Sequence, residues 1–577
     1  MLSRADALTA LTDEEFDVVV IGGGVTGAGV ALDAASRGYS VAVVERADWA
    51  SGTSSRSSKM VHGGLRYLQN FDLGLVREAL VERQLMVELA PHLVYPTPFL
   101  VPVLGDDRRN RLIGIGLNMY DVMATTRVGS SRRERRRESA LRGEGSERAP
   151  DPDRWSPDRH RTIPGADAAE LVPALRPRDP REAYLFYDCQ TDDARLVLTI
   201  LGEAERFGAV LRNGTDVTGL VEDSGRAVGV SCADSETGET FEVRAANVVN
   251  ATGVWADRIR PREIHDEAEV PRIAPSRGTH VTVSQDDLPI GTAACVVPAG
   301  EDRTIFALPW YGRTLIGTTD RDYEGGLDHI ESSAEDIDYL LDAANAFFDA
   351  GLDRSKLTGA YAGVRPLISS GDPRKSVDIS RKAELYETSS GMLTITGGKL
   401  TTWRRMAKQV VDRMVDREGR EAPCRTHEIP LGMPANDVNL EPPQGLRVSG
   451  DGLPEGHREL LSFRYGHAAR TVLRIAAERS GLAEPIVAGQ PDLLAEVALA
   501  ARLEQARSVG DVLLRRTRLA LLAAPQLRTP EDVQPVARVL GEELGWDEGR
   551  IRAAADAWPA EAAAEGVDPA GDPAVSG

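Results

Sequence analysis

The chain has 577 residues, 42% of them hydrophobic, which is enough for about two to four globular domains with large buried cores. Its formal net charge of −21 argues against a nucleic-acid partner, because binding to a phosphate backbone requires a net basic face. The charge does not exclude a small anion held in a local arginine pocket.

The cysteines and the apolar runs set further limits. The four cysteines Cys189, Cys232, Cys295 and Cys424 are isolated, so we expect no disulfide framework, zinc site or intrinsic iron–sulfur centre. This pattern favours a reducing cytoplasm. The N-terminus lacks the apolar core of a signal peptide, and no segment approaches about 18 uninterrupted apolar residues, so any membrane contact is expected to be peripheral.

A dinucleotide-binding pattern opens the chain. The apolar run Val18–Ile21 leads into the GxGxxG turn Gly22–Gly27, and a second apolar run, Val41–Val44, ends at Glu45. The glycines allow a tight turn, a close approach to a pyrophosphate at the helix N-terminus, and close packing of the helix on the strand. Glu45 is predicted to accept hydrogen bonds from the ribose hydroxyls of an adenosine. The pattern does not distinguish NAD from FAD.

Three elements are predicted after this unit. The serines Ser54, Ser55, Ser57 and Ser58 follow the second strand and can hydrogen-bond to cofactor phosphates or ribityl hydroxyls. The breaker-free run Leu73–Leu89 before Pro91 predicts a helix. The stretch Tyr95–Leu104 alternates prolines with apolar residues, which predicts a strand at a sheet edge.

The polar segment between Arg127 and Pro164 lacks apolar periodicity, which predicts a mobile surface insertion. Its arginine cluster has two interpretations, a solvated charged loop and a contact with anionic lipid head groups. Acidic residues are interleaved with the arginines, which favours the solvated loop. The cluster comprises Arg132, Arg133, Arg135, Arg136 and Arg137.

Strand and helix patterns alternate in the second half of the chain. An amphipathic helix is predicted to start at Asp192, the β-rich stretch Ile273–Ile316 predicts an antiparallel sheet over a pocket, and Ser333–Ala350 predicts a helix. Prolines after Ala422 indicate a linker to a helical region over His457–Ala564. The terminal segment 559–577 is expected to fray.

Two small-residue turns are candidate cofactor contacts. The apolar strand before Ala251-Thr252-Gly253 predicts a turn that brings backbone beside the bound dinucleotide, although an ordinary strand-to-turn junction fits equally well. Gly397-Gly398-Lys399 lies between a predicted strand and a helix that begins at about Leu400. The helix N-terminus and the lysine charge suit the pyrimidine end of a flavin, which becomes anionic on reduction.

The order of several longer motifs resembles the FAD-dependent glycerol-3-phosphate dehydrogenase family, among the glutathione-reductase-type flavoproteins related to D-amino-acid oxidase. The resemblance spans roughly residues 14 to 540. The matching motifs are IGGGVTGAGVALDAASRG, GTSSRSSKMVHGGLRYL, DDARLVL, NATGVWAD, GTTD, AGVRPL and GGKLTTWR, followed by EVALAARLEQARSVGDVLLRRTRLAL.

The resemblance implies an α/β fold of three parts. These are a glutathione-reductase-type, Rossmann-like FAD-binding domain, an antiparallel-sheet substrate (cap) domain, and an all-α C-terminal domain. The FAD-binding domain is expected over 14–90, 186–262 and 359–425, the cap over 91–185 and 263–358 with the arginine-rich insertion at about 130–160, and the helical domain over 430–565.

The resemblance also implies the reaction: FAD-dependent oxidation of sn-glycerol 3-phosphate to dihydroxyacetone phosphate, by hydride transfer from C2 to flavin N5, with electrons passed to quinone at the inner face of the cell membrane. A homodimer is compatible with it. Open alternatives are a glycerol-3-phosphate oxidase that uses oxygen and an amine or amino-acid oxidase on the same scaffold. A non-catalytic FAD-binding scaffold is disfavoured, because it would not need the arginine, histidine and lysine set.

Residue roles follow from these motifs. Arg66, Arg365 and Arg381 are expected to bind phosphate and substrate oxygens with the help of Tyr67, because arginine offers forked donors that stay charged. His62 is the first candidate for the base that takes the hydroxyl proton, with His280 second, and Lys399 stabilises reduced flavin. The predicted cofactor-binding residues are Gly22, Gly23, Gly24, Thr26, Gly27, Glu45, Ser54, Ser55, Ser58, Lys59, Ala251, Thr252, Gly253, Gly398, Lys399, Leu400 and Thr401.

Overall fold

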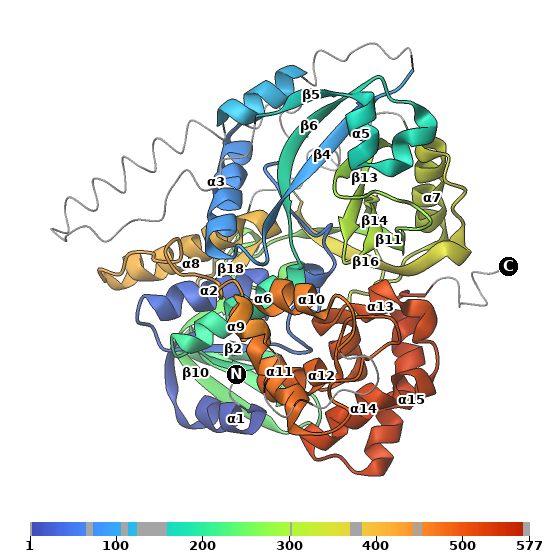
Figure 1. Cartoon of the computed structure of the whole chain (residues 1–577). Helices are drawn as coiled ribbons and strands as arrows, with labels where there is room; N and C mark the ends of the chain where they lie inside the picture. The colour runs from blue at the N-terminus through green and yellow to red at the C-terminus, as the bar shows by residue number, and fades with distance from the viewer. Residues whose placement is uncertain are drawn as a thin grey trace.

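Two sheets and a helical C-terminal region make up the chain, as the sequence predicts. The computed structural model describes residues 3–64, 73–105, 114–123, 159–300, 303–369, 383–441, 443, 446 and 453–568. In Figure 1 the first sheet lies at the lower left, the second sheet at the top, and the C-terminal helices at the lower right. None of the helices described is long and apolar enough to cross a membrane.

The first sheet has the order β17-β18-β10-β1-β2-β7, in which the five strands from β18 to β7 are parallel and β17 is antiparallel to β18. β1 pairs in parallel with both β2 and β10. Antiparallel β8 and β9 extend from β10. The strands are β1 (Glu15–Ile21), β2 (Val41–Val44), β7 (Val210–Arg212), β8 (Thr215–Asp223), β9 (Arg226–Asp234), β10 (Thr240–Asn250), β17 (Glu384–Glu387) and β18 (Leu393–Thr396).

Side-chain alternation along β1 explains how this sheet is covered. Val18 and Val20 pack in one core with three helices, whereas Val19 and Ile21 pack in a second core with the N-terminal helix. Both faces of β1 are therefore buried from Val18 to Ile21, which is why that part of the strand is continuously apolar. The three helices are α2 (Val25–Ser36), α6 (Asp193–Arg206) and α8 (Trp403–Glu418), and the N-terminal helix is α1 (Arg4–Asp13).

The second sheet is largely antiparallel, in the order β15-β11-β14-β13-β12-β4-β6-β3, with β16 added to β11 and β5 to β6. Its strands are β3 (Met60–Val61), β4 (Tyr95–Val103), β5 (Arg161–Pro164), β6 (Glu182–Gln190), β11 (Ile273–Ser284), β12 (Ala294–Pro298), β13 (Thr304–Trp310), β14 (Arg313–Gly317), β15 (Arg321–Asp322) and β16 (Leu357–Ile368). The accompanying helices are α3 (Leu73–Leu89), α5 (Gly165–Leu171) and α7 (Ala334–Phe348).

Two expectations about this sheet were wrong in part. β4 is a strand, but it lies between β6 and β12 rather than at an edge. Its prolines are compatible with that position because β4 pairs with β12 only at Phe99 and Leu100, so few N–H groups are needed on that side. The predicted insertion also ends earlier than expected, because Arg161–Pro164 form β5. Residues 124–158, with the arginine cluster, lie outside the described residues.

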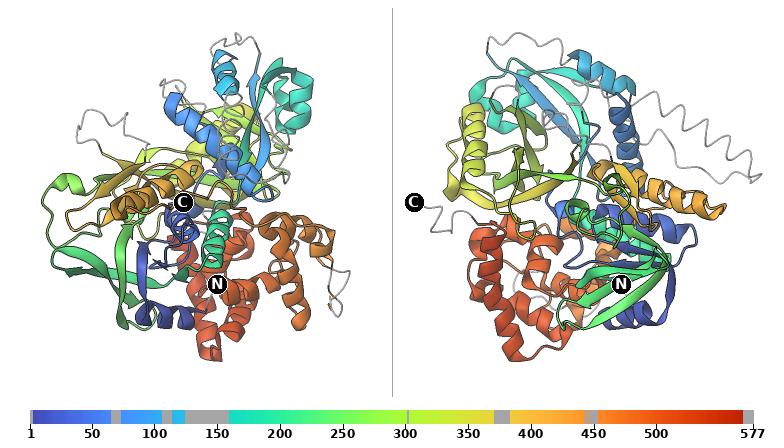
Figure 2. Two further views of the ribbon diagram at one scale, coloured as in Figure 1. Left: turned by 90° about the vertical axis from the view of Figure 1, so that its left-hand side faces the viewer. Right: turned by 180° about the vertical axis from the view of Figure 1, so that it is seen from behind.

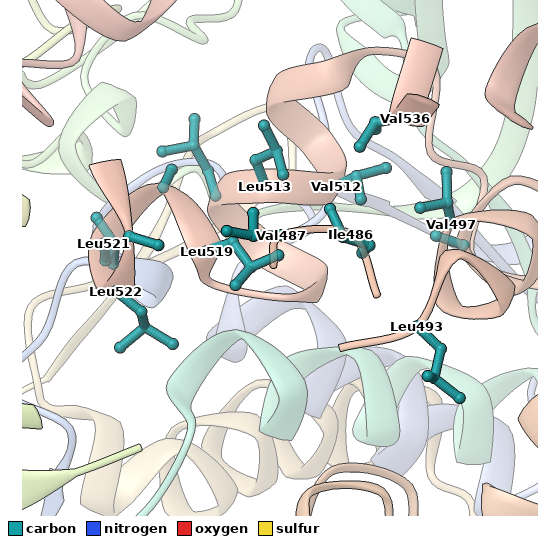
Figure 3. Close-up of a cluster of buried hydrophobic side chains, with 14 of the residues drawn as sticks. Ile486, Val487, Leu493, Val497, Val512, Leu513, Leu519, Leu521, Leu522 and Val536 are labelled. Carbon is teal, nitrogen blue, oxygen red and sulfur yellow. The ribbon is translucent and has the colours of Figure 1, made fainter. Parts of the chain in front are cut away.

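The C-terminal helices enclose an extensive apolar core, shown in part in Figure 3 around Val512, Leu513 and Leu519. Figure 2 shows these helices against the first sheet and beneath the second. The terminal segment is ordered further than predicted: α15 continues through Ala564, and the carbonyl of Val567 accepts from the N–H of Ala360 at 2.9 Å. Residues 569–577 lie outside the described residues. The helices are α9 (Asp437–Leu440), α10 (His457–Tyr465), α11 (Ala469–Glu478), α12 (Leu494–Leu503), α13 (Leu519–Leu522), α14 (Pro530–Leu544) and α15 (Glu548–Ala564), with a π-helical turn at Asp511–Arg516.

Candidate active site

A cavity of about 410 Å³ lies at the carboxyl ends of β1, β2, β10 and β18. Open α/β sheets bind ligands at this edge. The predicted cofactor residues that line it are Gly22, Gly24, Thr26, Glu45, Ser54, Ala251, Thr252, Gly253, Gly398, Lys399 and Leu400. The predicted cofactor residues that do not line it are Gly23, Gly27, Ser55, Ser58, Lys59 and Thr401.

The glycine turn has the geometry that its spacing predicts. Gly22 has a φ of +109°, and a Cβ on Gly27 would lie 1.9 Å from the carbonyl oxygen of Gly22. Gly24 precedes α2 without a side-chain cap, and the next N–H, that of Val25, donates to Ser54 Oγ at 2.9 Å. The turn therefore leaves the helix N-terminus facing the cavity with only a neutral hydroxyl against it, an arrangement that suits a pyrophosphate.

Glu45 is held rigidly at the end of β2. Its Oε2 accepts from the N–H of Gly23 at 2.7 Å, and its Oε1 accepts from the N–H of Ala47 at 2.9 Å. Burial raises the pKa of this carboxyl, although the two backbone donors oppose the rise. Each oxygen retains a lone pair, so the carboxylate can also accept from hydroxyls of a ligand in the cavity.

Other lining residues escaped the sequence analysis. The guanidinium of Arg46 lies 4.7 Å from the ring centroid of Trp255, and both line the cavity. Thr215, Asp216 and Val217 reach it from the start of β8. Trp255 follows the Ala251-Thr252-Gly253 turn, so its motif offered a signal. The β8 residues carry no local pattern that indicates a site.

The Gly397-Gly398-Lys399 turn connects the cavity to His62. Both glycines have positive φ, and Lys399 precedes a 3₁₀ turn, Leu400–Thr402, that runs into α8. Thr401 Oγ1 accepts from the N–H of His62 at 3.2 Å and lies 3.3 Å from its carbonyl oxygen. The helix was predicted to begin at about Leu400, and α8 begins at Trp403 after this turn. Thr401 hydrogen-bonds to the backbone of His62 and does not line the cavity.

His280 comes from β11 and is almost fully buried. Its ring stacks on Tyr361 of β16, with centroids 4.7 Å apart and an interplanar angle of 9°, and its Nε2 lies 2.9 Å from Ser58 Oγ. Burial lowers the pKa of His280 well below 6.5, with further lowering from the cations Lys59 and Arg365. The ring is therefore neutral at physiological pH.

Arg365 is a partly exposed cation on β16, paired across the sheet with Ser276 of β11. Its guanidinium donates to Asp320 Oδ1 at 3.1 Å, to Thr318 Oγ1 at 3.2 Å and to the carbonyl of Thr319 at 3.2 Å. These partners lie in the predicted GTTD motif. They fix the fork of the guanidinium beside His280, whose ring would touch a Cβ built on Gly317 at 2.2 Å.

Lys59 is fully buried at the end of the segment Ser54–Lys59, which we call the serine segment. Its Nζ donates to Asp193 Oδ2 at 2.9 Å and to the carbonyl of Ser55 at 2.6 Å. Burial lowers its pKa to about 8 against the opposing pull of Asp193. Lys59 therefore braces the segment that carries Ser54 and Ser58, and direct contact with a cofactor stays a prediction.

Three predicted site residues, Arg66, Tyr67 and Arg381, lie outside the described residues, so their positions relative to His62, His280 and Arg365 stay predictions. Within the described parts of the chain, no group of three or more His, Cys, Asp or Glu side chains could hold a metal ion.

Comparisons with known proteins agree with this geometry. Residues 17–404 match the model of the FAD dependent oxidoreductase family, and residues 391–551 match the C-terminal domain of alpha-glycerophosphate oxidase. The chain is 38% identical over 547 residues to glycerol-3-phosphate dehydrogenase 2 of Mycobacterium tuberculosis, covering 94% of this chain and 87% of the relative. It is 33% identical to the aerobic glycerol-3-phosphate dehydrogenase of Bacillus subtilis, covering 95% and 94%.

A solved structure extends the comparison to the fold. The X-ray structure of the glycerol-3-phosphate dehydrogenase from Bacillus halodurans complexed with FAD covers 97% of both chains, with a TM-score of 0.74 and 28% identity. The predicted three-part α/β architecture is thereby confirmed.

Proposed function

This chain belongs to the FAD-dependent glycerol-3-phosphate dehydrogenase family, and we propose that it oxidises sn-glycerol 3-phosphate to dihydroxyacetone phosphate. The observation that carries the proposal is that one segment of the chain connects the dinucleotide cavity to the candidate substrate site. One short segment, Ser54–Lys59, joins the dinucleotide cavity to His280, and His280 lies beside Arg365. A cofactor site and a cationic substrate site are therefore adjacent.

The cavity fits FAD, the cofactor of this family. The glycine turn and α2 N-terminus would hold the pyrophosphate, Glu45 the adenosine ribose, and the turn at Gly398 and Lys399 the flavin end. FAD, when bound, accepts the hydride that leaves C2 of the substrate.

We propose that His62 is the general base that accepts the proton of the C2 hydroxyl. His280 is less suited as the base, because burial and the nearby cations Lys59 and Arg365 disfavour its protonated form. A neutral His280 instead offers a fixed hydrogen-bonding group, held by the stack on Tyr361. Comparing pH profiles of flavin reduction in H62N and H280N tests this division: the fall in rate at acidic pH, where a base becomes protonated, should disappear only in H62N.

Arg365 is proposed to bind the substrate through charge-assisted hydrogen bonds, together with Arg66, Tyr67 and Arg381. Its Asp320 partner fixes the guanidinium yet leaves it partly exposed, so an anion can reach it. Replacing Arg365 by alanine should lower kcat/KM about 10²–10³-fold, the scale for losing a charged partner at a reacting oxygen. The FAD spectrum should be unchanged. R354A, which removes another arginine paired with an aspartate, is the matched control.

Quinone is proposed as the electron acceptor, with peripheral contact at the inner membrane face. The support comes from the relatives compared above, which are 33–38% identical and are named dehydrogenases rather than oxidases. Mixing reduced enzyme with a soluble quinone or with oxygen measures the preference. Faster reoxidation by oxygen would instead favour the oxidase.

The substrate itself is tested by adding glycerol 3-phosphate to the holoenzyme under anaerobic conditions. Loss of the FAD absorbance band at a rate that saturates with substrate is expected. A band that stays oxidised, while amino acids or other hydroxy compounds bleach it, would overturn the substrate assignment.

A further inference from the structure

A buried four-charge cluster links the C-terminal domain to the candidate active site. It consists of Lys59, Asp192, Asp193 and Arg518, each 0% exposed. Lys59 belongs to the serine segment, the two aspartates precede and begin α6, and Arg518 lies between the π-helical turn and α13. We call this set the Arg518 cluster.

Arg518 is held in one orientation by acceptors around its guanidinium. Its backbone has a φ of +67°, and its Nη1 donates to the carbonyl of Leu514 at 2.8 Å. Its Nε and Nη2 donate to Asp192, with Nη2 at 3.0 Å from Oδ1, and Nη2 also donates to Asp193. The remaining Nη1 contact, at 3.4 Å, is the carbonyl of Ser55 in the serine segment.

Asp193 contacts both Arg518 and the serine segment. Its Oδ2 accepts from the N–H of Ser57 at 3.0 Å, from Ser57 Oγ at 2.6 Å and from Lys59 Nζ at 2.9 Å. The carbonyl of Ser57 accepts from the hydroxyl of Tyr361 at 2.8 Å, the ring on which His280 stacks. The path from Arg518 to His280 is therefore continuous.

The same segment faces both halves of the site. Ser54 and Ser57 line the dinucleotide cavity, whereas Ser58 hydrogen-bonds to His280. Two anions and two cations balance within the cluster, so deleting one cation would leave an uncompensated buried negative charge, which is strongly unfavourable. The segment would have to shift or an aspartate would have to take up a proton.

We propose that Arg518 is a positioning residue of the catalytic site, through which the C-terminal domain fixes the Ser55–Lys59 segment against FAD and His280. The proposal deepens the proposed function and rests on it for its kinetic readout. It gives the helical C-terminal domain a role in catalysis that its sequence does not indicate.

The test compares R518Q and R518K with R502Q as holoenzymes. Arg502 also makes a forked contact with a carboxylate, Glu543, but its partners all belong to the C-terminal domain. Each variant is measured for FAD dissociation constant, visible circular dichroism of the bound flavin, and kcat and KM for glycerol 3-phosphate.

R518Q should weaken FAD binding about tenfold, alter the flavin dichroism, and lower kcat about 10–100-fold with a smaller change in KM, since small displacements at a reacting site have effects of this size. R518K should recover part of each loss, and R502Q should match the wild type. If R518Q does not fold, D192N/R518Q removes one charge of each sign and is measured in its place.

Wild-type FAD affinity, dichroism and kcat in soluble R518Q, or in D192N/R518Q where R518Q does not fold, would overturn the proposal, as would equal losses in R502Q. If glycerol 3-phosphate fails to reduce the wild type, the proposed function falls. The FAD affinity and dichroism of R518Q still decide the positioning role in that case.

Discussion

His280 is a buried, neutral histidine close to two cations, Lys59 and Arg365. Its sequence context, an alternating strand, predicts only that the ring faces the sheet. The pKa of His280 is lowered first by burial and then by Lys59 and Arg365, which lie far away in the sequence. The stack on Tyr361 likewise depends on pairing between β11 and β16. His62 and Arg365 are similar: their motifs made them candidates, whereas the bracing by Thr401 and Asp320 required the three-dimensional arrangement.

Burial of neutral His280 predicts how stability depends on pH. Its folded-state pKa lies below the unfolded value of about 6.5, so its contribution is fully present above that pH and is lost as pH falls, until the folded pKa is reached. Between pH 6 and 5 the unfolding free energy should fall by up to about 1.4 kcal/mol per pH unit through this group.

In H280N the unfolding free energy, measured by chemical denaturation, should fall less steeply between pH 6 and 5, by up to about 1.4 kcal/mol per pH unit. His92, whose pKa burial lowers to about 4, provides the comparison, because H92N should remove a separate contribution of the same sign. An H280N slope equal to that of the wild type would contradict the assignment.

The glycine turn between β1 and α2 is the element that the sequence predicts best. Its constraints are local: the positive φ of Gly22 and the contact between Gly27 and Gly22 arise within one turn. Ser54 is different, because it meets the N–H of Val25 only after β2 has returned the chain to the same edge. The predictions for β4 and for residues 559–568 were wrong for the same reason, since partner strands and tertiary contacts decide whether prolines end an element.

Two glycine variants separate folding from binding in this turn. In G27A the new methyl group would meet backbone, which cannot move cheaply, so we expect several kcal/mol of destabilisation and loss of FAD. In G24A the methyl group would meet only Ser54 Oγ, at 3.1 Å, and Gly24 has the extended φ of −81°. G24A should therefore fold with near wild-type stability.

Gly24 lines the cavity, so G24A should nevertheless bind FAD at least about tenfold more weakly, because the methyl group obstructs close approach of the pyrophosphate. Thermal unfolding of the apoproteins and flavin titration distinguish the two effects. Equal stability of G27A and G24A apoproteins would contradict the packing argument.

Across the whole molecule, ion pairs between residues far apart in the sequence join the C-terminal helices to the FAD-binding part. Asp48, just beyond β2, accepts from Arg515 at 2.6 Å and from Arg516 at 2.8 Å, and all three are largely buried. No sequence pattern indicates that Asp48 pairs with Arg515 and Arg516, which lie 467 and 468 residues later in the chain. The helical character of the C-terminal region was predictable from its pattern, but its partner was not.

Replacing Asp48 by asparagine removes a carboxylate shared by two buried arginines, although Arg515 keeps its pair with Asp511 and Arg516 keeps its pair with Glu504. The unfolding free energy should therefore fall by about 3 kcal/mol, the lower end of the range for a broken buried pair. Burial alone would raise the pKa of Asp48, but Arg516 and Arg515 hold it below its ordinary value, so the carboxylate contributes stability above the unfolded pKa that is lost as pH falls through the folded one. The D48N profile should lack this acid dependence.

E236Q is the matched control at the same interface. Glu236 pairs with Arg507 and Arg550 but is 29% exposed, so its removal should cost no more than about 1 kcal/mol. Denaturant unfolding monitored by flavin fluorescence and by far-ultraviolet circular dichroism measures both variants. If D48N loses flavin before its helices unfold, the buried arginine contacts hold the C-terminal domain in register with the cofactor site. Coincident transitions and a loss no larger than that of E236Q would instead make this contact dispensable.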